Sequence, residues 1–228
     1  MINHQKAPVL GPDDVYSVST LDGSNTLYSR KYQATYHSIN GAVSESMHVF
    51  IQHCLNLQLH LPHIRILEIG FGTGLNAFLS FLFSRKHNIS VQYLGIDPYP
   101  ISIEIARSLD YPSYLAASVF ENVFLRMHDK SLFVQDGFSF EKRESFSLKN
   151  VDGPFDCIYF DAFDPVTQPE LWSLDFFQQL FNATSSGGCL STYCAKGEIR
   201  RFLIQSGYTV ERIPGAPGKR QMISATKP

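Results

Sequence analysis

The feature that most constrains the fold is the alternation, after Pro62, of short apolar runs with helix-like patterns. This alternation is typical of a largely parallel α/β sheet flanked by helices. We expect strands at 65–70, 91–96, 131–135, 155–160, 188–193, 208–213 and 221–225. We expect helices at 75–85, through 104–109, and at 169–181 and 196–205.

The segment before Pro62 has a different pattern, and we expect residues 1–61 to form an appendage to a main domain of residues 62–228. Two β-prone runs, 15–20 and 26–29, flank Asp22-Gly23 and predict a hairpin. A helix should follow, because apolar residues recur there at helical spacing. Its stripe, which we expect to pack against the main domain, is Val43, Met47, Phe50, Ile51, Cys54 and Leu55.

Composition narrows the class of protein. Of the 228 residues, 44% are hydrophobic and 18% are charged, as in ordinary globular proteins. The net charge of −2 means that a nucleic acid would have to meet a local basic face. No apolar run is long enough to cross a bilayer, and the N-terminus does not resemble a signal peptide, so we expect a cytoplasmic protein.

The cysteine pattern gives no sign of a metal site. None of Cys54, Cys157, Cys189 and Cys194 forms a CxxC pair, and no histidine cluster lies beside them in the sequence. We therefore expect buried free thiols and no bound metal.

A glycine-rich turn, Glu68-Ile69-Gly70-Phe71-Gly72-Thr73-Gly74-Leu75-Asn76, follows the first strand of the main domain. Glycines between a strand and a helix let a ligand approach the backbone closely. The spacing differs from the GxGxxG that seats a pyrophosphate, and the acidic Glu68 suits a cationic ligand such as S-adenosylmethionine. The predicted cofactor contacts here are Glu68, Gly70, Phe71, Gly72, Gly74 and Asn76. A packing turn in an unrelated α/β protein is the alternative.

Carboxylates end the strands that follow. Asp97 could accept hydrogen bonds from both ribose hydroxyls, and Asp136, next to Gly137, from an adenine amino group. Taken singly, each could instead belong to a solvated turn. Because ligands bind beyond the carboxyl ends of strands in open α/β sheets, the series of strand ends favours one cofactor site and a Rossmann-like fold.

Asp161 ends the fourth predicted strand and begins an aromatic segment, Asp161-Ala162-Phe163-Asp164-Pro165. There it would contact the cofactor and face the transferred methyl group. An ammonium has no lone pair with which to attack, so a carboxylate that orients an amine and helps its proton leave would be catalytic. Phe163 could stack on a flat substrate. Trp172 could do so too, although core packing is the more probable role for this side chain.

Basic residues gather near the C-terminus. Lys219-Arg220 follows a Gly/Pro-rich loop, and these two residues could bind phosphates at the edge of the site. A solvated helix face explains the other basic residues nearby, Lys196, Arg200 and Arg201.

These residues resemble the methyltransferase domain of the bacterial tRNA-modifying enzyme MnmC and its stand-alone, MnmD-type form. The resemblance rests on segments spread over most of the chain. They are Asp14-Val15-Tyr16-Ser17, Asp22-Gly23-Ser24, the run from Tyr36 to Ala42, the run from Glu45 to Phe50, Gly70-Phe71-Gly72-Thr73-Gly74-Leu75-Asn76, Asp161-Ala162-Phe163-Asp164-Pro165, Pro169-Glu170-Leu171-Trp172 and Gly218-Lys219-Arg220.

The resemblance implies methylation of the aminomethyl group of 5-aminomethyl(-2-thio)uridine at the tRNA wobble position, with Asp161 facing the amine. The partner would be the tRNA anticodon region, and a separate enzyme would supply the amine, since the printed chain has no flavin domain. The chain departs from the fused enzyme's pattern at Asp97, which replaces a Glu, and at Ala162 and Asp164, which replace a Gly and an Ala.

Three alternatives stay open. A polyamine aminopropyltransferase shares the Rossmann-like fold and an Asp near a nucleophilic amine, although its cofactor loop is usually richer in Gly and Asp. A protein or small-molecule amine methyltransferase is the second alternative. A cofactor-binding module that scaffolds a partner is the third, and the presence of Asp161 in an otherwise complete site argues against it.

Overall fold

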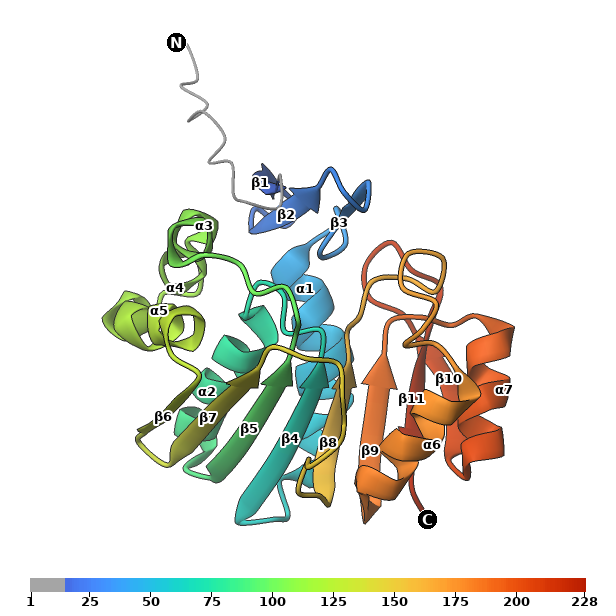
Figure 1. Ribbon diagram of the computed structural model, residues 1–228. Coiled ribbons are helices and arrows are strands. Elements are labelled where there is room, and N and C mark those ends of the chain that lie inside the picture. The colour runs from blue at the N-terminus through green and yellow to red at the C-terminus, as the bar shows by residue number, and fades with distance from the viewer. Residues whose placement is uncertain (1–14) are drawn as a thin grey trace.

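The computed structural model describes residues 15–228, and its centre is an eight-stranded sheet (Figure 1). The strand order is β10-β11-β9-β8-β4-β5-β7-β6. The strands are β4 (His63–Ile69), β5 (Ser90–Ile96), β6 (Leu132–Gln135), β7 (Phe138–Arg143), β8 (Phe155–Phe160), β9 (Thr184–Thr192), β10 (Thr209–Pro214) and β11 (Gln221–Thr226). The central strands β9, β8, β4, β5 and β7 pair in parallel, whereas β6, β10 and β11 pair antiparallel at the edges. The predicted α/β class is confirmed.

Helices cover both faces of this sheet. They are α2 (Leu75–His87), α3 (Ile103–Leu109), α4 (Tyr111–Tyr114), α5 (Glu121–Asp129), α6 (Leu174–Ala183) and α7 (Gly197–Ser206), with a 3₁₀ turn η3 (Ser118–Phe120). Side chains alternate along a strand, so neighbouring residues of β8 enter different cores. Tyr159 packs with the core that includes α2 and α5, and Phe160 packs with the core that includes α6 and α7.

The N-terminal segment forms a small sheet and then a helical stretch. Its elements are β1 (Val15–Ser19), β2 (Asn25–Ser29), β3 (Ala34–Thr35), α1 (Ala42–Ser46), a π-helix η1 (Met47–Gln52) and a 3₁₀ helix η2 (Leu55–Gln58). β1 and β2 pair antiparallel, as the hairpin prediction requires. Figure 1 places the small sheet above the carboxyl ends of the central strands. Residues 1–14 of the predicted appendage, Asp14 among them, lie outside the described residues.

The predicted apolar stripe of this segment does pack against the main sheet. Phe50, Cys54 and Leu55 are at most 1% exposed, and Phe50 lies 5.1 Å from the ring of Tyr159 on β8. The helix was expected to be continuous, but it changes from α to π geometry at Met47 and gives way to the 3₁₀ helix at Leu55.

Two details of the predicted main domain were wrong. The expected strand 131–135 is β6, an antiparallel edge strand, and the parallel strand in its place is β7, which the prediction missed. The helix expected from Pro169 begins only at Leu174, because the Ser173 side chain caps it by accepting a hydrogen bond from the Phe176 amide.

Between Val15 and Pro228, no helix is long and apolar enough to span a membrane.

Candidate active site

A cavity opens at the carboxyl ends of β4, β5 and β8. Parallel strands bring their carboxyl ends to one edge, which is why segments distant in sequence meet here. The lining residues are Tyr32, Tyr36, His37, Gly70, Phe71, Gly72, Thr73, Asp97, Tyr99, Phe146, Asp161, Ala162, Phe163 and Gln168.

The glycine turn after β4 forms the floor of this cavity. Gly70 has a φ of +90°, and a Cβ at this position would lie 2.6 Å from the carbonyl oxygen of Asp161. Gly74 caps α2 with left-handed geometry, and a Cβ there would lie 2.8 Å from Nε2 of His128. Both positions therefore require glycine, for conformation and for space. The turn brings the end of β4 against the end of β8.

Asp97 follows β5 directly and holds this turn in place. One carboxylate oxygen accepts a hydrogen bond from the Gly72 amide at 2.7 Å, and the other accepts from the Tyr99 amide at 2.8 Å. The residue is 8% exposed and lines the cavity. A carboxylate has about four lone-pair sites, so Asp97 is of a type that can accept hydrogen bonds from ligand hydroxyl groups as well as from the protein.

Asp161, Asn76 and Glu68 form a hydrogen-bonded network at the base of the cavity, in which Asn76 and Glu68 are buried and Asp161 is partly exposed. The Asn76 amide nitrogen donates to Glu68 and to Asp161, each at 2.8 Å. Tyr93 donates to the other Glu68 oxygen at 2.7 Å. Glu68 is completely buried and does not line the cavity. The structure thus places Glu68 beneath the cavity, where its carboxylate accepts hydrogen bonds from Asn76 and Tyr93, and its contact with a cofactor stays a prediction.

The two carboxyl groups of this network are hard to ionise. Burial raises the pKa of Asp161 well above its usual range, and the nearby Glu45 charge adds to the effect. The Asn76 hydrogen bond and the Lys219 charge act in the opposite direction. Burial raises the pKa of Glu68 as well, with a further contribution from Asp161. A cation next to such a carboxyl group favours its ionised form, because the cation offsets the negative charge.

Aromatic side chains form the wall of the cavity next to Asp161. The Phe163 ring lies 4.7 Å from the ring of Tyr32 and 5.0 Å from that of Tyr36. The Phe163 backbone is fixed by two side chains, since its amide donates to Gln168 at 2.9 Å and its carbonyl accepts from Trp172 at 2.7 Å. Trp172 itself is 4% exposed and packs on Phe160, which confirms core packing for this residue.

Lys219 and Arg220 have different surroundings. The Lys219 ammonium lies 2.6 Å from a carboxylate oxygen of Glu45 and 3.9 Å from the centre of the Tyr193 ring. Glu45, on α1, is 5% exposed, and the prediction did not include it. Arg220 is exposed just before β11. Since Glu45 already neutralises Lys219, Arg220 is the better placed of the two for contact with a phosphate.

Asp136 and Gly137 do not belong to this site. They form the turn between β6 and β7, and Gly137 accepts a hydrogen bond from Val91 at the beginning of β5. Asp136 is ion-paired with Arg85, near the end of α2, at 2.6 Å. The predicted adenine contact was wrong, because Asp136 ends an antiparallel strand and therefore lies at the opposite edge of the sheet. Phe146, which follows β7, lines the cavity instead.

The prediction missed the part of the site that the N-terminal segment supplies. Tyr32, Tyr36 and His37 line the cavity, and none of them follows a strand of the main sheet. Tyr36 and His37 lie in one of the segments that carried the family resemblance, which was the available signal for them. Tyr99 and Phe146 lie in loops after β5 and β7, where sequence alone gives no direction for a side chain.

Comparisons with known proteins agree with this geometry. The model of a family described as S-adenosyl-L-methionine-dependent methyltransferase matches residues 133–228. The bifunctional protein MnmC of tRNA 5-methylaminomethyl-2-thiouridine biosynthesis from Pseudomonas putida (strain W619) is 29% identical over 225 residues, covering 89% of this chain and 34% of the relative. The same-named protein of Azoarcus sp. (strain BH72) is 29% identical over 214 residues, covering 87% of this chain and 33% of the relative. The chain thus spans about a third of the length of these relatives.

The fold also has a match among solved structures. A crystal structure of MNMC2 from Aquifex aeolicus superposes with a TM-score of 0.80 at 24% identity, covering 96% of this chain and 73% of that one. The family implies S-adenosylmethionine as cofactor, and the residues present fit it. Asp97 offers carboxylate oxygens for hydroxyl groups, and Gly70 and Gly72 leave the backbone open to the cavity. The chain is therefore similar to S-adenosyl-L-methionine-dependent methyltransferases over residues 133–228 and to MnmC proteins over most of its length.

Proposed function

We propose that the chain transfers a methyl group to the aminomethyl nitrogen of 5-aminomethyl(-2-thio)uridine at the wobble position of tRNA, giving the methylaminomethyl nucleoside. The observation that carries the proposal is a partly buried carboxylate, Asp161, held by Asn76 beside an aromatic wall in the cavity. Carboxylate and aromatic rings together match the two halves of the substrate, which are a primary ammonium and a flat pyrimidine. The printed names of the relatives support the same acceptor.

Asp161 would act on the ammonium. The arriving cation offsets the charge of a carboxylate that is otherwise costly to ionise in this partly buried position. A carboxyl group with a raised pKa is also a stronger base than an ordinary one, so it accepts the ammonium proton more readily. The hydrogen bond from Asn76 fixes one oxygen of Asp161 and leaves the other for the substrate. Asp161 is thus the proposed catalytic residue, both orienting the nitrogen and taking its proton.

Phe163, Tyr32 and Tyr36 would hold the pyrimidine ring. Stacking of a base on an aromatic side chain contributes about 1–3 kcal/mol, and it needs no particular base edge. Because Gln168 and Trp172 fix the Phe163 backbone, the ring is already oriented before a substrate arrives. An unpaired wobble base presented in an anticodon loop is the kind of flat ligand that such a wall accepts.

The opposite end of the cavity would bind the cofactor. We propose contacts from Gly70, Phe71, Gly72 and Asp97, with Gly74 and Asn76 supporting the turn and the catalytic carboxylate respectively. When bound, S-adenosylmethionine supplies an electrophilic methyl group. The chain's own contribution is to keep that end of the cavity next to Asp161, through the close contact between Gly70 and the Asp161 backbone.

The tRNA would be held in part by Arg220, whose exposed guanidinium can contact a phosphate. We propose that the protein acts in the cytoplasm and that a separate enzyme supplies the aminomethyl nucleoside. The segment before Pro62 would act as an appendage that completes the acceptor side of the site, since Tyr32 and Tyr36 come from it.

The test is methyl transfer from labelled S-adenosylmethionine to tRNA that carries 5-aminomethyluridine, followed by nucleoside analysis. Fully modified tRNA is the control acceptor, and free polyamines and an amine-rich protein form parallel samples. We expect label only in methylaminomethyluridine. If label enters a polyamine or protein instead, the tRNA assignment is wrong while the methyltransferase assignment stands. If the protein binds S-adenosylmethionine and transfers nothing to any acceptor, the proposed activity is wrong.

A further inference from the structure

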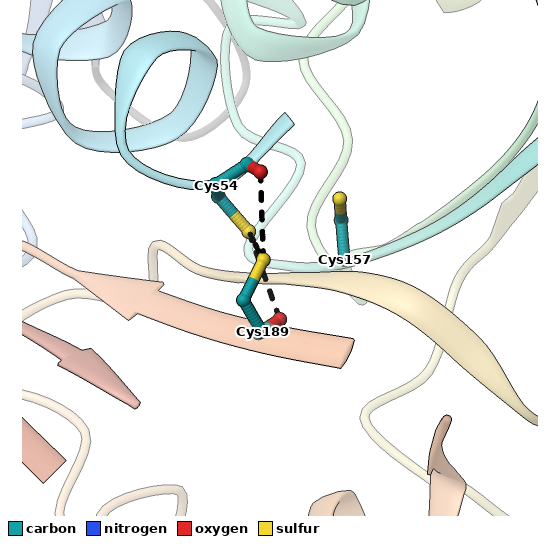
Figure 2. A group of neighbouring side chains, drawn as sticks. All are labelled: Cys54, Cys157 and Cys189. Carbon is teal, nitrogen blue, oxygen red and sulfur yellow. Dashed lines mark hydrogen bonds between the residues drawn. The ribbon is translucent and has the colours of Figure 1, made fainter. Parts of the chain in front are cut away.

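Three cysteines from separate parts of the chain meet inside the protein, away from the methyltransferase cavity (Figure 2). Cys54 lies between η1 and η2, Cys157 on β8 and Cys189 on β9. Their sulfur atoms all lie within 4.8 Å of one another, and those of Cys54 and Cys189 are 2.8 Å apart. The parallel register pairs Cys157 directly with Cys189, which places both side chains on the same face of the sheet.

The surroundings of this group, which we call the three-cysteine cluster, favour sulfur chemistry. All three residues are at most 1% exposed. The Gln58 side-chain amide points to the Cys189 sulfur at 3.8 Å, as a donor to a thiolate would. No lysine, arginine or histidine hydrogen-bonds to any of these sulfurs among the contacts described for residues 15–228, so a thiolate here needs another cation.

We propose that the three-cysteine cluster is a binding site for a soft, thiophilic metal ion that accepts three sulfur ligands. Sulfurs bound to one ion at ~2.3 Å in a trigonal arrangement lie ~4 Å apart. The three sulfurs here lie within 4.8 Å of one another, so small side-chain shifts would reach that arrangement. A structural zinc site normally has four ligands. The cluster offers three side-chain ligands within the described residues, so it suits Cu(I) or Cd(II) better than zinc.

The charge balance supports ligation of a divalent ion. Binding forms metal–sulfur bonds to all three cysteines and releases two protons to solvent, leaving two thiolates and one thiol around the ion. The resulting site is electrically neutral, so its burial is not opposed by a net charge. A disulfide between Cys54 and Cys189 would need an oxidant and would leave Cys157 without a role, whereas an ion uses all three sulfurs.

The position of the cluster indicates what the ion would do. It would join the N-terminal helical stretch to two strands of the main sheet, at a point that the hydrophobic packing already holds together. Cys157 lies on β8, four residues before Asp161, which follows that strand. Entry requires only local opening of the short η2 helix, where Leu57 is 53% exposed. The site is separate from the methyltransferase cavity, so this proposal does not depend on the proposed function.

Native mass spectrometry of the reduced wild-type protein with cadmium ions, in the presence of a competing chelator, tests the proposal without any mutation. We expect one cadmium ion per chain and a mass that shows two displaced protons. Failure to bind cadmium, binding of several ions without a preferred single one, or a disulfide between Cys54 and Cys189 in protein isolated without oxidant would overturn the proposal.

Variants then locate the site. Cys54→Ser, Cys157→Ser and Cys189→Ser should each lower cadmium affinity at least ~10-fold, since even indirect disturbance of a metal site has effects of that size. Cys194→Ser is the matched control, because Cys194 is also buried but lies outside the cluster, and it should bind cadmium like the wild type. If Cys194→Ser loses the ion, or if Cys189→Ser keeps it, the assignment is wrong. Circular dichroism identifies any variant that fails to fold. For such a position, the native mass spectrum of the wild-type protein with cadmium is the test of the proposal.

Discussion

Asp97 and Asp136 look alike in the sequence and have opposite places in the structure. Each follows a short β-prone run and precedes a residue typical of turns, Pro98 or Gly137. Asp97 ends a central parallel strand, is 8% exposed and fixes the glycine turn through Gly72. Asp136 ends an antiparallel edge strand, and its carboxylate is 45% exposed and paired with Arg85.

The difference shows what an acidic strand end can and cannot indicate. Every strand that runs in parallel places its carboxyl end at the cavity, so an acid there faces the ligand. A hairpin reverses the chain, so an acid in its turn lies at the far edge. The direction of a strand depends on its neighbours in the sheet, and local sequence does not contain that information.

We expect the largest effect at Asp161, which lines the cavity as Asp97 does. Asp161→Asn keeps the shape of the side chain and removes the base, so turnover should fall by ~10²–10⁴-fold. Cofactor affinity should change little. Methyl transfer and calorimetric cofactor binding measure the two quantities, and turnover within a few-fold of wild type would mean that Asp161 is not the base.

The second prediction compares the two edges directly. Asp97→Asn weakens charge-assisted hydrogen bonds at the cavity and should lower cofactor affinity by ~10–100-fold. Asp136→Asn, at the opposite edge, should leave cofactor affinity unchanged and alter stability by less than ~1 kcal/mol, because its ion pair is largely solvent-exposed. Calorimetry and urea unfolding check these effects. Equal losses of affinity in the two variants would contradict the assignment of the edges.

The third prediction concerns the pH dependence of stability that two buried histidines near the cavity, His37 and His128, should cause. Burial lowers the pKa of His128, behind the glycine turn, from 6.5 to about 3, and that of His37 from 6.5 to about 4. Below pH 6.5 the unfolded chain therefore binds protons that the folded chain refuses, so stability falls as the pH falls from 6.5 to 4. Each ring contributes up to ~1.4 kcal/mol per pH unit.

Urea unfolding at several pH values between 7 and 4 measures this slope. His128→Phe keeps an aromatic ring between Phe71 and Phe124 and should remove about half of the histidine contribution. His60→Gln, at an exposed position, is the control and should leave the slope as it is. A slope that is the same in His128→Phe and wild type would show that His128 does not drive the acid sensitivity.

The smallest expected effect concerns the edge of the site. Arg220→Ala should lower tRNA affinity a few-fold and reduce the salt slope of binding by ~1, the value of one phosphate contact. Lys219→Ala should change the slope less, because Glu45 already neutralises Lys219. Filter binding at several salt concentrations measures both slopes, and an unchanged slope in Arg220→Ala would exclude the phosphate contact.

Much of the fold was predictable because its signals are local. The strand β8 was predicted with its observed bounds, and the glycine turn, the hairpin and the fifth strand were found from apolar runs and turn residues. β7 was missed because its second half, Glu141-Lys142-Arg143, is entirely charged, and the sequence does not reveal that Lys142 is buried there. The helix α5 was missed as well, although its buried residues recur at helical spacing.

The sequence by itself determined the α/β class, the glycine turn and the carboxylates Asp97 and Asp161, since each depends on residue types at short spacing along the chain. Only the tertiary structure decided that Asp136 lies at the opposite edge of the sheet and that Tyr32 and Tyr36 line the cavity. It also decided that Glu68 and Asp161 both accept hydrogen bonds from Asn76. It also brought together Cys54, Cys157 and Cys189, which no sequence spacing connects. The physical reason is that strand direction, burial and contact between distant segments are properties of the packed sheet, and a local pattern contains none of them.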